Sequence, residues 1–480
     1  MREVEGPPSG SSRVAMEKLS TQAPMLVTAT PRMRQVLTLW DLVFFGIVLI
    51  QPIAPIPIWG VAQKLSNGHY VTTILLAMFA MLITGFSYGR MASIYPSAGS
   101  AYTYVGKGLN TYLGFLVGWA MLLDYLIIPL VNGIWVAVVV HARYFPRIPY
   151  AVAMSLVTFF MTAPNLRGIK TSARADKILL VAMCSVTGVF ILLAVRFLFH
   201  YQGWGGLMST QPFYNPKTFN AHTVWKATSY AALTYIGFDG VTTLAEDVEN
   251  PKRNVLLATV LVCLFTGIFG GLLAYLGQRV WPDWRTLPNL ETAFMDVCKR
   301  VGGLPLFHAM GFTILMATLS AGLAGIVAAA RLLFAMGRDN VLPRKIFAHL
   351  SPATDTPTYN ILIIAAIVFL GAIALQSVGN AFEHAGELLN FGAFFAFMNV
   401  NLAAFWQFAF VRPHKSRVGT FADSLLSLFG ATFCGIIWWN LNIVAKIAGG
   451  GWLIIGVIYL AINTQGFRTP PRKIDFGGQT

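Results

Sequence analysis

Residues 229–253 read SYAALTYIGFDGVTTLAEDVENPKR, and this stretch decides the fold. It begins like an apolar helix that crosses a bilayer. Gly237, Asp239 and Gly240 then interrupt it, and it ends in a run of charged residues. A helix that breaks inside a membrane frees backbone N–H and C=O groups, which a bilayer tolerates only beside a protein-lined cavity. The stretch therefore predicts a binding site at mid-membrane.

The composition is that of a polytopic membrane protein. The chain of 480 residues is 56% hydrophobic and 11% charged, with a mean hydropathy of +0.63, whereas an average soluble domain carries about 25% charged residues. Its four cysteines show no paired spacing, which argues against a disulfide framework or a metal site. Residues 1–35 are polar and carry no signal-peptide core, so we expect a disordered cytoplasmic tail.

Twelve apolar runs are long enough to be membrane spans. We place them at residues 39–62, 70–94, 112–140, 148–164, 177–200, 224–247, 254–279, 305–335, 359–376, 386–411, 422–440 and 448–464. An even number of spans leaves both termini on one side. If that side is the cytoplasm, it holds 23 of the 34 Lys and Arg residues, which agrees with the positive-inside rule. This bias accounts for the net charge of +15 without a nucleic-acid partner.

The first span carries a second interruption, LIQPIAPIPIWG at residues 49–60. Pro52, Pro55 and Pro57 lack an N–H and disfavour helix at the preceding residue, so we expect an extended chain there. Five spans begin with each break, one to five and six to ten. Breaks at matching places in two halves are typical of inverted-repeat transporters, whose site lies between the repeats.

Several segments resemble signatures of the amino acid–polyamine–organocation superfamily. They are YIGFDGVTTLAEDVENPKRN (235–254), YPSAGSAYTY (95–104), NLRGIK (165–170) and AAARLLFAMGRDN (328–340). FSYGR (86–90) and GFLVGWAMLLDY (114–125) look most like the putrescine-importer branch.

The resemblance implies an all-α, leucine-transporter-type fold of twelve transmembrane helices. Helices one and six would be broken, and a 5+5 inverted repeat would be followed by two extra helices. The repeats would cover residues 36–221 and 222–411, and residues 412–480 would hold the last two helices and a cytoplasmic tail. The chain would then be a multi-pass protein of the cell membrane, with a bacterial inner membrane expected, and either a monomer or a homodimer.

The first break departs from the amino-acid-transporting members, which usually carry a Gly-Ser-Gly-like run whose amides hold a substrate carboxylate. This chain has QPIAP at residues 51–55, where two positions have no N–H to give. The amides of Ile53, Ala54 and Ile56 are expected to remain. We expect the substrate-binding residues to be Ile50, Gln51, Pro52, Ile53, Ala54, Asp124, Tyr235, Ile236, Gly237, Phe238 and Asp239.

We assign three acidic residues to spans: Asp41, Asp124 and Asp239. An acid at the bilayer centre normally faces a cavity or a partner. Asp239 could exchange a proton, or it could simply accept bonds from the freed amides of its broken helix. Asp124 could pair with a substrate amine, or it could bond a neighbouring helix. Phe238 could close over the substrate as a gate, or fill a helix interface.

These features favour a secondary transporter for an amino acid, amine or polyamine, working by proton-coupled symport or by exchange. The proton is the first choice of coupling ion and sodium the second, with no other cofactor. The alternatives are a carrier of another small polar or carboxylate solute, or a sensor or channel on the same fold. An enzyme is disfavoured because no nucleophile or metal-ligand spacing occurs, and no nucleotide-binding motif indicates an ATP-driven pump.

Overall fold

The computed structural model describes residues 37–471 except 96–99, 168–172, 246–247, 339, 353, 355 and 412–416. Within these residues the chain forms helices and turns, and its one β-bridge is an isolated pair between Leu37 and Val248. The expectation of a disordered tail over residues 1–35 falls outside the described residues. So do parts of the 95–104 and 165–170 signatures.

Nine helices of the described chain are long and apolar enough to cross a membrane, and each coincides with a predicted span. They are α4 (Tyr70–Ile94), α6 (Thr111–Val139), α8 (Ala173–Leu207), α10 (Pro251–Val280), α11 (Ala293–Arg338), α13 (Thr358–Val378), α14 (Ala381–Trp406), α15 (Arg417–Trp439) and α16 (Ile443–Asn463). A π-helical turn extends α6 as η1 (Val140–Tyr144), and another extends α14 as η5 (Gln407–Val411).

The other three predicted spans form shorter pieces. The first is split into α2 (Leu39–Ile50) and α3 (Trp59–Leu65), and the fourth is α7 (Tyr150–Leu166). The sixth consists of α9 (Ala221–Ala231) and the 3₁₀ helices η2 (Ala232–Tyr235) and η3 (Phe238–Leu244). Both interruptions therefore lie where the prolines and glycines predict them.

Three short elements connect the long helices: α5 (Ser100–Gly108), η4 (Trp284–Thr286) and α12 (Arg344–Phe347). Two of the long helices also exceed their predicted spans, because α8 and α11 each include an extra segment joined through a kink. Gly203 and Gly303 adopt φ values of 61° and 68° at these kinks, a conformation that favours glycine. Apolar length alone predicts neither segment.

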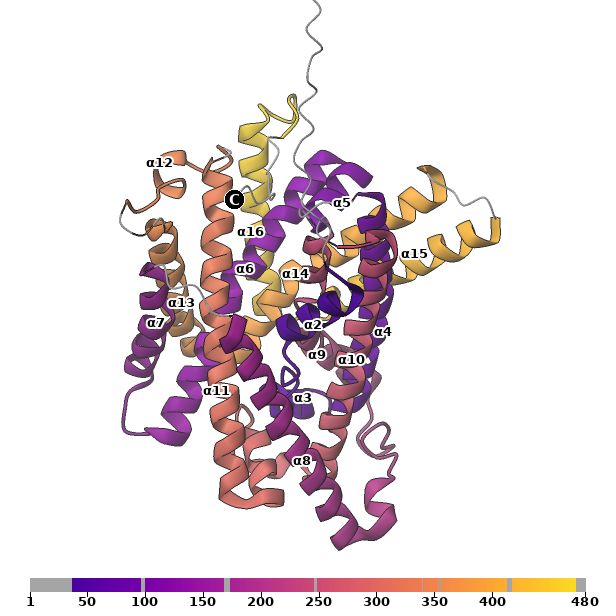
Figure 1. Cartoon of the computed structure of the whole chain (residues 1–480), viewed down its shortest axis with the longest axis vertical. Coiled ribbons are helices and arrows are strands. Elements are labelled where there is room, and N and C mark those ends of the chain that lie inside the picture. Colours follow the sequence, from indigo (N-terminus) through magenta and orange to yellow (C-terminus); the bar gives the residue numbers. More distant parts are fainter. Residues whose placement is uncertain are drawn as a thin grey trace, which may run out of the picture. The chain divides into compact units, whose positions relative to one another are not determined.

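The two halves of the chain pack together in a bundle within residues 36–480. Helices α4 and α10 lie side by side, and α6 packs on both α11 and α14 (Figure 1). At the α4–α10 contact a Cβ on Gly89 would lie 2.5 Å from the Leu256 Cα, so glycine lets the two backbones touch.

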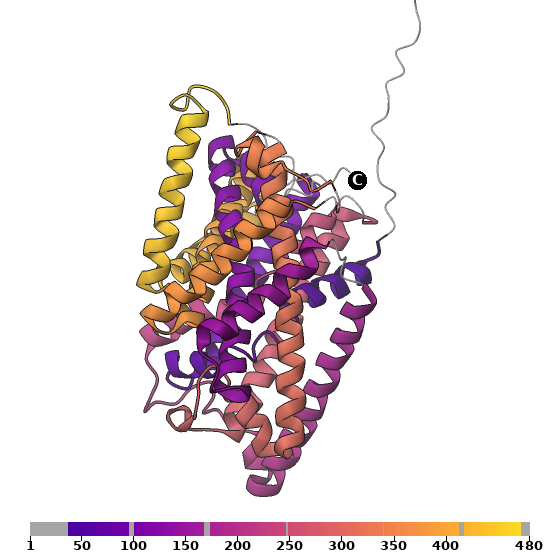
Figure 2. The ribbon, with the colours of Figure 1, turned by 90° about the vertical axis from the view of Figure 1, so that its left-hand side faces the viewer.

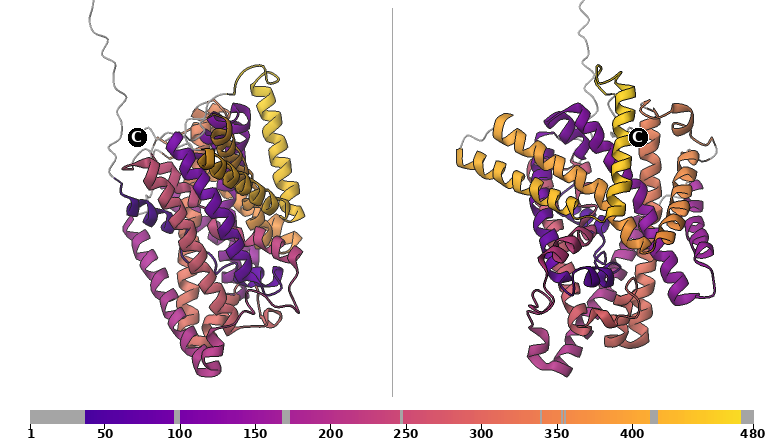
Figure 3. Two further views of the ribbon diagram at one scale, coloured as in Figure 1. Left: turned by 90° about the vertical axis from the view of Figure 1, so that its right-hand side faces the viewer. Right: turned by 180° about the vertical axis from the view of Figure 1, so that it is seen from behind.

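Helices α8 and α16 lie on opposite edges of the bundle in the view of Figure 2. Their outer faces carry exposed apolar side chains such as Leu192 and Ile462, as expected for helices in contact with lipid. Helices α14 and α15 lie against each other as a pair, which Figure 3 shows from behind.

Candidate functional site

The break in the first span is a series of tight turns. Helix α2 ends at Ile50, Gln51 adopts a φ of 65°, and three successive i→i+3 hydrogen bonds follow. The Ala54 N–H donates to Gln51 O (3.0 Å), Ile56 N–H to Ile53 O (2.9 Å) and Trp59 N–H to Ile56 O (3.2 Å). The expectation of an extended chain is wrong, because Pro52 and Pro57 occupy second turn positions, where their fixed φ is favourable.

These turns also correct the expectation about free amides. The N–H groups of Ala54 and Ile56 are already bonded to backbone carbonyls. Within residues 51–57, which are all described, Ile53 is left as the one residue whose N–H has no backbone acceptor. A single amide is a poor clamp for a carboxylate, which accepts several hydrogen bonds.

The break in the sixth span lies at Ile236 and Gly237. Helix α9 tightens into η2, Gly237 adopts a φ of 108°, and the chain continues as the 3₁₀ helix η3. Only glycine adopts this left-handed conformation without steric cost. The sequence prediction of a break at this glycine is confirmed.

The two breaks lie against each other. A Cβ on Gly240 would come within 2.6 Å of Leu49 Cδ1, and one on Gly46 would come within 2.7 Å of Val241 Cγ2. Near the start of α2, Glu249 N–H donates to Leu37 O at 2.9 Å. The small residues of both spans therefore bring α2 and η3 together along the candidate site.

The expected site residues make different contacts. Ile50 and Ile53 are buried, Ala54 and Ile236 are half-buried, and Pro52 is buried within the turns. Gln51 Nε2 donates to Ala317 O of α11 at 3.2 Å. The Tyr235 hydroxyl donates to Ile74 O of α4 at 2.7 Å. Gln51 and Tyr235 thus tie the two breaks to the surrounding helices.

Phe238 is fully buried in a cluster of aromatic rings. Its centroid lies 5.5 Å from that of Tyr88, with the rings edge to face, and 5.1 Å from that of Phe397. The ring therefore fills the interface between η3, α4 and α14, while also bordering the acidic centre described next.

Asp124 of α6 and Asp239 of η3 form a half-buried acidic centre. The two carboxyl groups lie within electrostatic range of each other and of the Tyr88 hydroxyl. No lysine or arginine of the described residues acts on either carboxylate at this range. Within the part of the chain that the structure describes, no cation therefore balances the acidic pair.

The two acids differ in their hydrogen bonding. The Asp239 carboxylate accepts bonds from the backbone amides of Asp239 and Gly240, as expected for the start of a broken helix. Asp124 Oδ1 is buried without a hydrogen-bond partner among the described residues, and so is the fully buried Tyr88 hydroxyl. Buried polar atoms are normally bonded, so unpaired ones beside an acidic pair indicate a place for a ligand.

The sequence analysis missed Tyr88, Glu387 and Asp423. Tyr88 lies within the quoted 86–90 signature, where a tyrosine in an apolar span was the available signal. The number of acidic residues assigned to spans, three, was also too low. Glu387 lies in α14 within the predicted tenth span, and Asp423 lies in α15, where it pairs with Arg90 at 2.8 Å.

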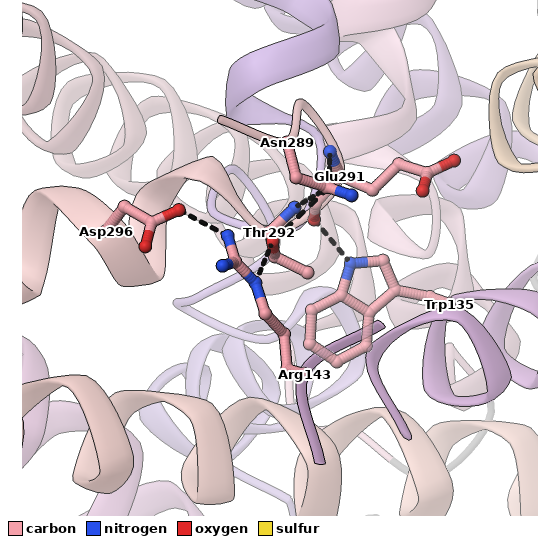
Figure 4. A network of polar contacts seen from close by, with 6 residues as sticks. All are labelled: Trp135, Arg143, Asn289, Glu291, Thr292 and Asp296. Atoms are coloured by element: carbon pink, nitrogen blue, oxygen red, sulfur yellow. Dashed lines mark hydrogen bonds and ion pairs between the residues drawn. The ribbon is translucent and has the colours of Figure 1, made fainter. Parts of the chain in front are cut away.

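A polar network joins the end of α6 to the loop before α11 (Figure 4). Arg143 donates through Nε to Thr292 Oγ1 at 2.7 Å and pairs with the Asp296 carboxylate. Trp135 Nε1 donates to Glu291 O at 3.2 Å, and Asn289 Oδ1 accepts the Glu291 and Thr292 amides. Burial raises the pKa of the Glu291 carboxyl, which points away from Arg143.

Comparison with known proteins identifies the family. The sequence profile described as "Amino acid permease" matches residues 58–468. The chain is also 33% identical over 449 residues to the low-affinity putrescine importer PlaP of Escherichia coli K12, covering 92% of this chain and 96% of that protein. The chain belongs to the amino acid permease family.

Other relatives of this permease are named for different substrates. It is 26% identical to the branched-chain amino acid permease BcaP of Lactococcus lactis over 90% of this chain and 95% of the relative. It is 24% identical to the methylthioribose transporter of Bacillus subtilis, with coverage of 95% and 97%.

Among solved structures, the permease resembles the manganese transporter of Eremococcus coleocola. The TM-score is 0.53 at 11% sequence identity, over 92% of this chain and 98% of the other. This likeness concerns the helical fold alone. Among the described residues no group of three His, Cys, Asp or Glu side chains is placed to hold a metal ion.

Proposed function

We propose that this permease is a secondary transporter that carries a small amine across the membrane by alternating access. The observation that carries the proposal is the half-buried acidic pair of Asp124 on α6 and Asp239 at the break in the sixth span, on which no lysine or arginine of the described residues acts at close range. A primary ammonium group would supply the missing charge and the hydrogen bonds that Asp124 Oδ1 and the Tyr88 hydroxyl lack.

The first break favours an amine over an amino acid. Since Ala54 and Ile56 use their amides within the turns, one free N–H at Ile53 is left for a carboxylate. Of the three relatives quoted above, the one with the highest sequence identity is named as a putrescine importer, which agrees with an amine or polyamine substrate. Another small polar solute on the same fold is the alternative, because other relatives are named for an amino acid and for methylthioribose.

The proposed architecture has twelve spans, arranged as a five-plus-five inverted repeat and two further helices. Nine long helices among the described residues, the short α7 and the two broken spans support this count. The repeats are proposed to cover 36–221 and 222–411, followed by residues 412–480. The Lys and Arg bias supports cytoplasmic termini, and bacterial relatives support an inner membrane. The assembly is proposed to be a monomer or a homodimer, without a nucleic-acid partner.

For energy coupling we propose proton symport or substrate exchange. Asp239 and Asp124 are the proposed proton-exchanging groups, because the two acids lie within electrostatic range of each other and Asp239 lies at the break in the sixth span. Sodium is the second choice of ion. The site carries no proposed chemical step, so we propose that the permease is not an enzyme.

Uptake of radiolabelled putrescine by proteoliposomes tests this function. We expect saturable uptake by the wild-type protein and loss of at least about tenfold in Asp124→Asn, which removes one charge-assisted partner. Asp283→Asn is the control, since Asp283 is an exposed loop acid. If no amine is taken up and a carboxylate without an amine is, the amine assignment fails.

Counterflow separates a carrier from a channel or a sensor on the same fold. Liposomes preloaded with unlabelled putrescine should transiently concentrate the labelled amine if the protein alternates between an outward-open and an inward-open state. A channel would only equalise the label, and a sensor would move none.

A further inference from the structure

A second group of acids lies away from the Asp124–Asp239 pair. Glu383 and Glu387 lie four residues apart in α14 and so face the same side of the helix, and Glu291 precedes α11. All three carboxylates lie within electrostatic range of the Tyr230 hydroxyl of α9. We call these four residues the glutamate cluster.

Close packing holds the cluster together. A Cβ on Gly386 would lie 3.4 Å from the Tyr230 ring, so the ring lies directly on α14. One turn further along α14, Asn390 Nδ2 donates to Ser229 O at 2.6 Å. The backbones of α9 and α14 are therefore fixed at the point where the acids meet the tyrosine.

Two members of the cluster have fully buried polar atoms without partners. Glu387 is 0% exposed; one of its oxygens accepts the Asn442 N–H, while Oε1 makes no hydrogen bond within the described chain. The Tyr230 hydroxyl is likewise 0% exposed and has no partner there. A buried carboxylate oxygen and a buried hydroxyl that both lack partners together indicate a missing donor.

Basic groups surround the cluster without pairing with it. Lys226, Lys64 and His384 act electrostatically on Glu383, and Lys226 and Lys446 act on Glu387. None of them lies within ion-pair distance of a cluster carboxylate in the described structure. Lys446 instead lies over the Trp439 ring, 5.4 Å from its centroid. The lysines therefore moderate the negative potential, while Glu387 Oε1 stays open to a donor within the described chain.

The cluster also adjoins the first break. Tyr230 lies within electrostatic range of Tyr70, whose hydroxyl donates to Pro55 O at 3.3 Å. Two tyrosines thus connect the glutamates with the proline turns of the candidate site. In the proposed topology, α9 and α14 both begin at the outer face, so the cluster lies between that face and the break.

We propose that the glutamate cluster is a second binding site for an ammonium group, which an amine occupies before it reaches the Asp124–Asp239 pair. The ammonium N–H groups would donate to Glu387 Oε1 and to the Glu383 carboxylate, and the Tyr230 hydroxyl oxygen would accept a further bond. This inference rests on the proposed amine transport. It adds a second group of residues that determines the apparent affinity of the transporter for the amine.

Uptake kinetics of putrescine in proteoliposomes test the proposal with Glu383→Gln, Glu387→Gln and Tyr230→Phe. We expect an apparent KM about tenfold higher for each Gln variant, and about threefold higher for Tyr230→Phe, with kcat unchanged. Tyr230→Phe removes one oxygen and keeps the ring, so it remains informative if a glutamate variant folds poorly. Asp283→Asn, an exposed acid outside the cluster, should keep the wild-type KM.

The outcomes separate this inference from the proposed function. If the wild-type protein transports putrescine and all three variants keep its KM, the cluster does not bind the amine and only the second site is overturned. If the wild-type protein transports no amine, the proposed function fails as well. If sodium chloride, compared with potassium chloride at equal ionic strength, stabilises the wild-type protein but not Glu387→Gln, the cluster binds an inorganic cation and the ammonium assignment is wrong.

Discussion

The carbonyl group of Leu49 lies directly against Gly237. A Cβ on this glycine would be 3.6 Å from both the carbonyl carbon and the oxygen of Leu49, and Gly237 itself has a φ of 108°. The last turn of α2 therefore contacts Gly237, where the backbone of the sixth span adopts the left-handed conformation. Because the two breaks share this contact, movement of either one reaches the other.

Gly237→Ala is expected to destabilise the protein and to slow uptake. A side chain at this positive φ costs about 1–2 kcal/mol, whatever the space around it. Thermal unfolding in detergent should show a lower Tm than that of the wild-type protein. Gly188→Ala is the control, because its Cβ would meet nothing within 4 Å and its φ is helical. An unchanged Tm for Gly237→Ala would mean that the break does not need the left-handed conformation.

The ion pair of Arg143 and Asp296 should contribute more to stability than that of Arg285 and Asp283. The side chains of the first pair are 20% and 12% exposed, and those of the second 59% and 54%. Removing the partly buried pair's acid with Asp296→Asn should cost about 1.5–3 kcal/mol, whereas Asp283→Asn should cost less than about 1 kcal/mol. Thermal unfolding of the two variants side by side measures the difference, and equal losses would contradict the account.

Glu291→Gln should stabilise the amine-free protein at neutral pH. Burial raises the pKa of this carboxyl above its ordinary value of 4.5, so its protonated form is favoured in the fold. The resulting stability is fully present below the unfolded pKa and is lost as the pH rises through the folded pKa. The Tm advantage of the Gln variant should therefore shrink as the pH falls toward 4.5. An advantage that is independent of pH would show that ionisation of Glu291 is not its cause.

Asp239→Asn should remove the pH dependence of uptake if Asp239 exchanges the coupling proton. An asparagine keeps the shape and the amide contacts of η3 but cannot titrate. Uptake driven by an inward proton gradient is compared with uptake at equal pH on both sides. Asp423→Asn is the control for acid loss in a span, since Asp423 pairs with Arg90 away from the breaks. If the variant keeps the wild-type response to the gradient, another group couples the proton.

The long helices and both breaks could be predicted from local sequence. In the described part of the chain apolar length defines nine of the spans, and the prolines and Gly237 mark the interruptions because their backbone limits act locally. The turns at residues 51–59 were missed, because prolines that interrupt a helix are compatible both with an extended chain and with successive β-turns. The kinks at Gly203 and Gly303 were not predicted either, since a glycine within a helical pattern does not by itself specify a positive φ.

The candidate site was less accessible to sequence reasoning than the fold. Asp124 and Asp239 stood out because acids are rare in spans, but their approach to Tyr88 depends on the packing of α4, α6 and η3. Glu387 was missed although it lies within a predicted span. The grouping of Glu291 with Tyr230 joins residues 61 positions apart in the sequence, which only the folded chain brings together.

The central claim is that this site recognises an amine and lacks a clamp for a carboxylate. Competition of putrescine and ornithine against labelled putrescine uptake tests it most directly, because ornithine is the same diamine with one added carboxylate. The account predicts that ornithine competes at least about tenfold less well, since its buried carboxylate would find too few donors. Competition by ornithine equal to or stronger than that of putrescine would contradict it.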